Sequence, residues 1–257
     1  MNFIYSLCAA FSMFSALTVP QVPWEKEKIR YMLVCLPFVG VIIGAAEYLW
    51  MVLADLLELS MVLRAAGLTL IPVLLTGGIH LDGFMDTVDA LKSHAEPEKK
   101  RAILKDPHAG AFAVIGLCAY LLAYFGLGTG AVWTDRVILL LGLAHVMSRS
   151  LSAVSGTLLP MGPGEGTLRF FRQAADKRAG VLAVCWVILT AVVMVLAWPL
   201  AGGVMALGAL LTLLLVRRMA MTEFGGISGD IAGFQLQVAE LVMLVLLVLM
   251  ERISVKL

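Results

Sequence analysis

The sequence predicts an all-α protein, a polytopic bundle of about seven to eight transmembrane helices. Of its 257 residues, 61% are apolar and only 14% are charged, against about 45–50% and about 25% in soluble globular chains. Long apolar runs recur along the chain, and several reach the roughly 20 residues that cross a hydrocarbon layer of about 30 Å. A soluble globule could not cover so much apolar surface, so we expect lipid to cover a single integral membrane domain over residues 1–257.

Eight apolar stretches are candidates for these membrane spans. The first and the seventh are short, so the sequence does not decide whether they cross the membrane or only enter it. The stretches lie near 3–19, 31–54, 61–79, 109–131, 136–159, 180–200, 203–216 and 234–250.

The connections between these stretches predict the orientation of the chain. Eight crossings place both termini on one face and four connections on the other. Those four contain 14 of the 19 lysines and arginines, an excess that predicts the cytoplasmic face of a bacterial or archaeal cell membrane. The net charge of only +1 gives no reason to expect a nucleic-acid partner. The four predicted cytoplasmic connections lie near 20–30, 80–108, 160–179 and 217–233.

The most informative polar stretch is Gly77-Gly78-Ile79-His80-Leu81-Asp82-Gly83, with two further aspartates downstream. At about 100° per residue, Asp82, Asp86 and Asp89 lie on one narrow stripe of a helix. They repel one another, and if the preceding helix continues through them they also lie near its C-terminus, where the dipole disfavours anions. A divalent cation would remove both penalties, and an all-oxygen set suits Mg²⁺. The alternatives are a solvated acidic helix end, or a helix broken at Gly83.

Two further clusters could act on a phosphate beside that metal. Lys105 and Asp106 precede Gly110, where a bare backbone allows close approach to a ligand. The alternative for this basic loop is membrane topology and attraction to anionic lipid. Four glycines surround Asp230 in the run 225–233, which indicates either a ligand-binding turn or a flexible connection.

Ionisable residues also lie inside the predicted spans. Glu47, His145, Arg149 and Glu240 each stand in an apolar run, and charges in lipid usually face the bundle interior or a watery cavity. Arg149 and Glu240 could form a buried pair, and the sequence leaves open whether that pair is structural or contacts substrate.

Taken together, these motifs resemble the cobalamin synthase family, whose members are also called adenosylcobinamide-GDP ribazoletransferases. The likeness covers essentially the whole chain in order; one departure is Ala90, where the family often has glycine. It implies that GDP-activated adenosylcobinamide phosphate is transferred to alpha-ribazole or its 5′-phosphate, with release of GMP and a requirement for Mg²⁺. The product would be adenosylcobalamin or its 5′-phosphate, formed in the last steps of cobalamin biosynthesis.

The resemblance and the motifs together give a set of expected site residues. Attack of a hydroxyl on a diphosphate needs charge neutralisation at the phosphates and a group that orients or deprotonates the hydroxyl. We therefore predict catalytic roles for Asp82, Asp106 and His80; Mg²⁺ ligation by Asp82, Asp86, Asp89 and Asp230; and substrate contacts from Lys105, Gly110, Arg149, Gly229 and Glu240.

Parts of the sequence also fit three other functions. A membrane prenyltransferase would carry a second acidic motif, but the second region here is a glycine-rich loop with the single Asp230. An alcohol phosphatidyltransferase would carry a longer pattern with further spaced aspartates after the first Asp-Gly, and this sequence lacks that pattern. A transporter is suggested by the ionisable residues within spans, but the polar residues crowd at one face and no internal repeat is visible. The sequence leaves open the ribazole form, the lower-ligand base, the number of metals and the oligomeric state, a homo-oligomer included.

Overall fold

The computed structural model describes residues 2–254, and within them every regular element is a helix. The exception to helix and loop is one isolated bridge between Met161 and Ile227. The helices are α1 (Asn2–Phe14), α2 (Lys26–Ile29), α3 (Met32–Leu56), α4 (Met61–Thr76), α5 (Ile79–Lys92), α6 (Pro97–Ile103), α7 (Ala111–Gly130), α8 (Asp135–Leu158), α9 (Thr167–Ala174), α10 (Ala179–Ala197), α11 (Pro199–Glu223) and α12 (Gly229–Ser254).

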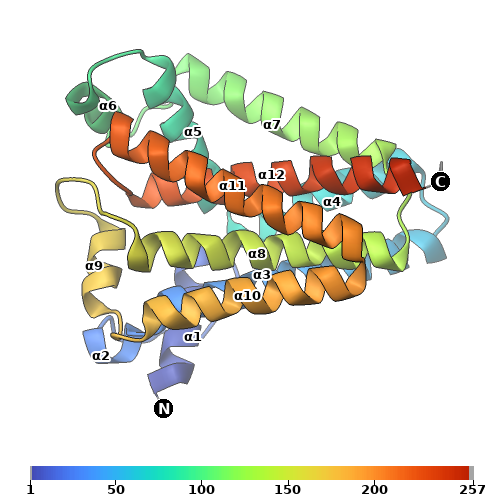
Figure 1. Cartoon of the computed structure of the whole chain (residues 1–257), viewed down its shortest axis with the longest axis horizontal. Coiled ribbons are helices and arrows are strands. Elements are labelled where there is room, and N and C mark those ends of the chain that lie inside the picture. The colour runs from blue at the N-terminus through green and yellow to red at the C-terminus, as the bar shows by residue number, and fades with distance from the viewer. Residues whose placement is uncertain (1, 255–257) are drawn as a thin grey trace.

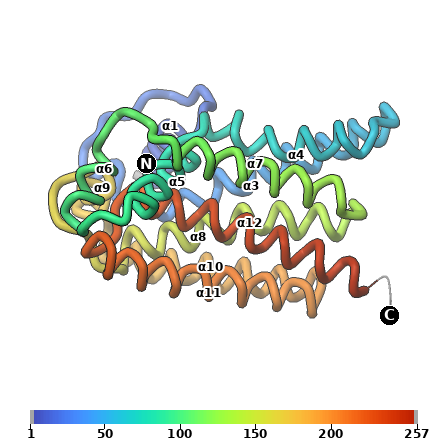
Figure 2. Tube along the Cα trace, turned by 90° about the horizontal axis from the view of Figure 1, so that it is seen from above, coloured from blue at the N-terminus to red at the C-terminus, as the bar shows by residue number. Residues whose placement is uncertain are grey.

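The long helices lie side by side, which confirms a polytopic helical bundle (Figure 1). Six of them, α3, α7, α8, α10, α11 and α12, are long and apolar enough to cross a membrane, and α4 with α5 could form a seventh, broken span. The short helices α2, α6 and α9 gather at one end of the bundle, and Figure 2 shows α6 and α9 together at that end. We call this the polar end, because it carries most of the basic residues.

The two short predicted spans have different outcomes. The stretch at 3–19 forms α1, a helix of only 13 residues, which is shorter than the roughly 20 needed to cross. An eighth crossing is therefore not supported. The stretch at 203–216 belongs to α11, which has 25 residues because the helix starts at Pro199 and continues through Arg217 and Arg218. Much of the predicted connection 217–233 is thus helical.

The third predicted span is broken at its polar end. Gly77 and Gly78 have φ values of 63° and 77°, a left-handed conformation that favours glycine. The chain bends by 95° there, so α4 carries the apolar part of the span and α5 lies beyond the bend. The expectation that one helix continues through the aspartates is wrong. Asp82 instead occupies the first turn of α5, where the helix dipole favours an anion.

Helix α8 forms the centre of the bundle, in contact with α3, α10 and α12. Small residues allow the closest of these contacts. A Cβ on Gly44 would lie 2.7 Å from the Cα of Gly142, and one on Gly40 would lie 2.5 Å from the carbonyl oxygen of His145. Close backbone packing through glycine is typical of helices in membranes. It fixes α3 against α8 and so positions the residues that both helices contribute to the interior.

Candidate active site at the polar end

A cavity of about 560 Å³ opens at the polar end of the bundle. Its walls come from the end of α1, the start of α3, α5, α6 with the segment after it, α8, α9 with the loop before it, and the start of α12 with the loop before it. Five residues predicted from the sequence line it together: His80, Asp82, Lys105, Gly229 and Asp230. Segments about 150 residues apart in the chain therefore meet in one site.

Asp82 and Asp230 are brought together by close packing of α5 on α12. A Cβ on Gly83 would lie 2.8 Å from both the Cα and the carbonyl oxygen of Asp230, and one on Gly233 would lie 3.1 Å from the carbonyl oxygen of His80. Gly83 does not break the helix: it stays within α5 and lets α12 approach. The two glycines explain why each aspartate lies in a glycine-containing motif.

Asp86 and Asp89 stand further along the same helix. Partial burial, followed by the negative charges of Asp82, Asp230 and Asp89, raises the pKa of Asp86 to about 6. The four predicted metal ligands therefore act on one another electrostatically. Gly110 packs directly against Asp89, since a Cβ on Gly110 would overlap that carboxylate. Of these residues, none of Asp86, Asp89 and Gly110 lines the cavity.

The residues present fit a Mg²⁺ ion that also takes ligands from substrate and water. Across residues 2–254, no three acidic, histidine or cysteine side chains stand close enough to hold a metal by themselves. Mg²⁺ is usually held by one or two carboxylates together with substrate phosphates and several waters. Asp82 and Asp230 supply two carboxylates inside the cavity, and the repulsion felt by Asp86 indicates a site that a cation would stabilise.

His80 lies in the wall of the cavity with no hydrogen-bond partner. Its side chain is 5% exposed, both ring nitrogens are buried and unpaired, and the ring stacks on Phe14 with a centroid distance of 6.0 Å. Burial lowers the pKa of His80 to about 3, so the imidazole is neutral and one nitrogen can accept a hydrogen bond. An unpaired buried polar group is costly, which points to a ligand as its partner.

Asp106 differs from the other predicted catalytic residues. Its carboxylate is exposed and does not line the cavity. It accepts hydrogen bonds from the backbone N–H of His108 at 2.9 Å and pairs with His108 Nδ1 at 2.7 Å. The backbone hydrogen bond lowers the pKa of Asp106. The local turn accounts for the side chain without a substrate, and its predicted catalytic role stays a prediction.

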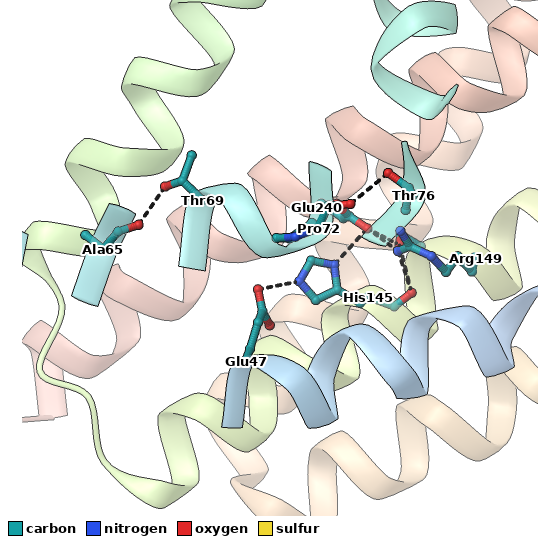
Figure 3. Close-up of polar contacts among 9 residues, drawn as sticks. Glu47, Ala65, Thr69, Pro72, Thr76, His145, Arg149 and Glu240 are labelled. Carbon is teal, nitrogen blue, oxygen red and sulfur yellow. Dashed lines mark hydrogen bonds and ion pairs between the residues drawn. The ribbon is translucent and has the colours of Figure 1, made fainter. Parts of the chain in front are cut away.

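Arg149 and Glu240 form a separate, buried network in the bundle interior (Figure 3). They pair with each other and are 0% and 3% exposed. Glu240 Oε1 also pairs with His145 Nδ1 at 2.9 Å, and His145 Nε2 pairs with Glu47 Oε1 at 3.1 Å. Arg149 and Glu240 line a cavity of only about 10 Å³, which holds one water at most. The structure therefore places these two residues together but away from the large cavity.

Sequence reasoning missed two arginines and one loop of the cavity. Arg101 on α6 and Arg169 on α9 both line it, as does the loop 161–167. A signal for the loop exists in the sequence, because Gly162, Gly164 and Gly166 alternate with other residues there. No signal distinguishes the two arginines from the other basic residues of the connections, because only the fold decides which of them face inward.

The fold and the site define a multi-pass helical membrane protein with a charged cavity at the polar end of its bundle. Comparison with known families gives its place among such proteins. The family model for cobalamin-5-phosphate synthase matches residues 6–248, and the chain belongs to that family. No solved structure matches this chain.

The sequence similarity to curated relatives extends along nearly the whole chain. The chain is 38% identical over 242 residues to the adenosylcobinamide-GDP ribazoletransferase of Lachnoclostridium phytofermentans, covering 94% of this chain and 92% of that protein. It is 32% identical to the protein of the same name from Clostridium botulinum strain Alaska E43, covering 94% and 96%. It is 30% identical to the one from Listeria monocytogenes, covering 95% and 98%.

Proposed function

We propose that this chain is the transferase that completes cobalamin assembly, acting on GDP-activated adenosylcobinamide and alpha-ribazole or alpha-ribazole 5′-phosphate. A ribazole hydroxyl attacks the phosphorus attached to the cobinamide. A new P–O bond forms to the ribazole, the P–O bond to the leaving phosphate breaks, GMP departs, and the hydroxyl proton passes to a base. Membership of the family supports the reaction, and the cavity lined by His80, Asp82, Lys105 and Asp230 supports its location.

We further propose Mg²⁺ as the cofactor, held by Asp82 and Asp230 with the substrate phosphates. Bound there, Mg²⁺ would neutralise the phosphate oxygens and stabilise the leaving nucleotide. Asp86, next along the helix, would strengthen the negative field that attracts the ion and could supply a further ligand. The supporting observation is electrostatic. Burial, and then repulsion from three neighbouring carboxylates, raises the pKa of Asp86. A divalent cation would offset this repulsion.

His80 is the proposed partner of the attacking hydroxyl. Because both ring nitrogens are buried and unpaired, a ribazole hydroxyl in the cavity could donate a hydrogen bond to the neutral imidazole. This contact would orient the nucleophile toward the phosphorus. The apolar residues Met13, Phe14, Leu33 and Leu36 line the same cavity and suit the flat faces of a nucleoside base or a corrin.

The test is turnover by the purified protein in detergent or nanodiscs. GDP-activated cobinamide, alpha-ribazole and Mg²⁺ are supplied, and GMP and the cobamide product are quantified. We expect one GMP for each cobamide and no turnover in EDTA until Mg²⁺ is restored. Formation of cobamide without any divalent cation would contradict the metal proposal, and absence of turnover with both ribazole forms would contradict the reaction.

We also infer that the polar end faces the cytoplasm of the cell. Its support is the excess of lysine and arginine in the connections 20–30, 80–108 and 160–179. In a cysteine-free background, His94→Cys at the polar end and Val132→Cys at the other end can be labelled with an impermeant maleimide. Intact cells should label only position 132, and labelling of position 94 before permeabilisation would reverse the orientation.

A further inference from the structure

The large cavity contains charges of both signs that do not pair. Asp82 and Asp230 line it on the α5–α12 side, and Arg101, Lys105 and Arg169 line it from α6, the segment after α6, and α9. No ion pair within 4.0 Å joins any of these five side chains to a partner in the part of the chain that the structure describes. Opposite charges in one cavity attract, so a geometry that holds them apart leaves both sets available to a ligand.

The positions of the two arginines are fixed by backbone carbonyls. Arg101 Nη1 donates to the carbonyl oxygen of Phe224 at 3.4 Å, and Arg169 Nη2 donates to the carbonyl oxygen of Gly162. Both arginines are half-buried. Each guanidinium has five N–H donors, so one such contact orients it and leaves most donors free for a second, anionic partner.

The loops that carry these contacts are tied together. The backbone N–H of Gly162 donates to the carbonyl oxygen of Ile227 at 3.0 Å. The backbone N–H of Ile227 donates to the carbonyl oxygen of Pro160 at 2.9 Å. Gly226 has a φ of 145° and packs on Met161 so closely that a Cβ there would overlap it. The pairing joins the loop that leads into α9, which carries Arg169, to the loop that leads into α12, which carries Asp230.

Lys105 completes the basic side of the cavity. It is exposed, its ammonium group pairs with no acidic side chain in residues 2–254, and its Nζ lies 3.6 Å from the position that a Cβ on Gly164 would take. Glu165 on the same loop also lines the cavity but is exposed and pairs with none of the three cations. Three cations and a glycine-rich backbone opposite two carboxylates match a ligand that is itself anionic and carries a divalent cation.

We infer that Arg101, Lys105 and Arg169 bind the diphosphate of the GDP-activated substrate, opposite Asp82 and Asp230. The inference rests on the proposed function for the identity of that diphosphate. Of the two cations predicted to contact substrate, Lys105 keeps that role, and Arg101 and Arg169 take the place of Arg149. The three cations would offset charge on the transferred and leaving phosphates, and Arg149 in the interior would have no part in it. The unpaired nitrogens of His80 in the same cavity independently indicate a bound ligand.

Steady-state kinetics of the full-length protein in nanodiscs test the inference. Arg101→Gln, Arg169→Gln and Lys105→Gln should each raise the KM for the GDP-activated substrate, or lower kcat/KM for it, about tenfold to a hundredfold, as expected for loss of a charged hydrogen bond. The KM for alpha-ribazole should stay within about twofold. Arg169→Lys, which keeps the charge, should recover part of the loss. A shift confined to the ribazole KM, or unchanged kinetics in all three variants, would overturn the inference.

Matched controls come from the same helices. Lys99→Gln on α6 and Arg172→Gln on α9 remove the same charge from side chains that do not line the cavity, so the kinetics should match the unmodified protein. If these controls lose as much as the cavity variants, a general charge effect replaces the inferred contact. Thermal unfolding of every variant identifies any loss of activity that comes from misfolding. If a Gln variant misfolds, the kinetics of Arg169→Lys, which keeps the charge, test the contact instead.

A binding experiment separates this inference from the proposed reaction. With Mg²⁺ present, inorganic pyrophosphate and GDP should bind the unmodified protein and bind at least about tenfold more weakly to the triple Gln variant. This outcome supports the diphosphate subsite even if no turnover is found. Equal binding by both proteins would overturn the inference even if turnover is normal. Loss restricted to nanodiscs that contain anionic lipid would show that the cations bind lipid phosphate instead, and would also overturn it.

Discussion

The interior network and the polar-end cavity contain the same kinds of side chain in opposite arrangements. In the interior, Arg149, Glu240, His145 and Glu47 pair with one another across α3, α8 and α12. In the cavity, aspartates and cations share one space without pairing. Buried charges that pair with each other serve the fold, whereas charges held apart by the backbone remain able to bind a ligand.

This difference separates two roles that the sequence does not separate. Each group combines acidic, basic and polar residues near glycine or serine, and each lies within or beside an apolar run. The interior group has only a cavity of about 10 Å³ beside it. The polar-end group surrounds about 560 Å³, enough for a large part of a nucleotide-sized ligand.

The largest expected effect is on turnover. Asp82→Ala should reduce kcat/KM by about a thousandfold or more, because preorganised charge at a phosphoryl-transfer site contributes several kcal/mol to transition-state stabilisation. GMP release measures the loss, and unchanged thermal unfolding shows that the fold survives. Glu98→Gln, on the exposed side of α6, is the matched control and should retain activity. Turnover by Asp82→Ala close to that of the unmodified protein would remove the metal proposal.

The next effect is on stability. Arg149→Ala should lower the free energy of unfolding by about 3–5 kcal/mol, because the carboxylate of Glu240 stays buried without its partner. Replacing both residues, as Arg149→Met with Glu240→Met, should recover part of that loss. Chemical unfolding in detergent measures both variants. The fraction of Arg149→Ala that remains folded should turn over normally, and selective loss of its activity would show that Arg149 contacts substrate after all.

A smaller effect is expected where α5 meets α12. Gly83→Ala should destabilise the protein by roughly 1–3 kcal/mol, because the added Cβ meets the backbone of Asp230, which cannot rotate away. Gly126→Ala on α7 is the control, since nothing lies within 4 Å of its Cβ position. That variant should be neutral or slightly stabilising. Equal stability of the two variants would show that α12 can move away from α5 at little cost.

The smallest effect is the dependence of stability on pH and Mg²⁺. The pKa of Asp86 is raised to about 6 in the folded protein, by burial and then by neighbouring carboxylates, whereas it is near 4 in an unfolded chain. Folding therefore favours the protonated form, and without metal this contribution to stability is lost as the pH rises from about 4 to about 6. Added Mg²⁺ should restore stability above pH 6 and have little effect below pH 5.

Thermal unfolding in EDTA and in Mg²⁺ across this pH range measures the difference. Asp86→Asn should flatten the pH dependence in EDTA, because the titrating group is gone. A Mg²⁺ effect that is the same at pH 5 and pH 7.5 would mean that the ion binds away from these carboxylates.

Much of the site was predictable because its motifs are local. His80 and Asp82 lie in one short stretch, and the same holds for Gly229 and Asp230; all four line the cavity. The structure also brings together Arg149 and Glu240, the pair that the sequence suggested. What local patterns could not give is the direction in which Arg101 and Arg169 point, since every connection at this end is basic.

The bend at Gly77 and Gly78 is a second feature that local sequence patterns could not predict in full. A glycine pair indicates a turn or a close approach, but not how far the chain turns. A helix that continued through the glycines would place the aspartates near its C-terminal end, whereas the bend of 95° places Asp82 in the first turn of a new helix. The helix dipole therefore stabilises the Asp82 carboxylate instead of destabilising it.

The amino-acid sequence alone determined the class of fold, because apolar runs of bilayer length leave a helix as the structure that satisfies the backbone in lipid. It also determined the family resemblance and the residues at the centre of the site. Only the tertiary structure decided which charges pair and which stay apart. That outcome depends on helix crossings set by Gly83 and Gly233 and on the pairing of two loops at Met161 and Ile227, contacts between distant segments that no local pattern encodes.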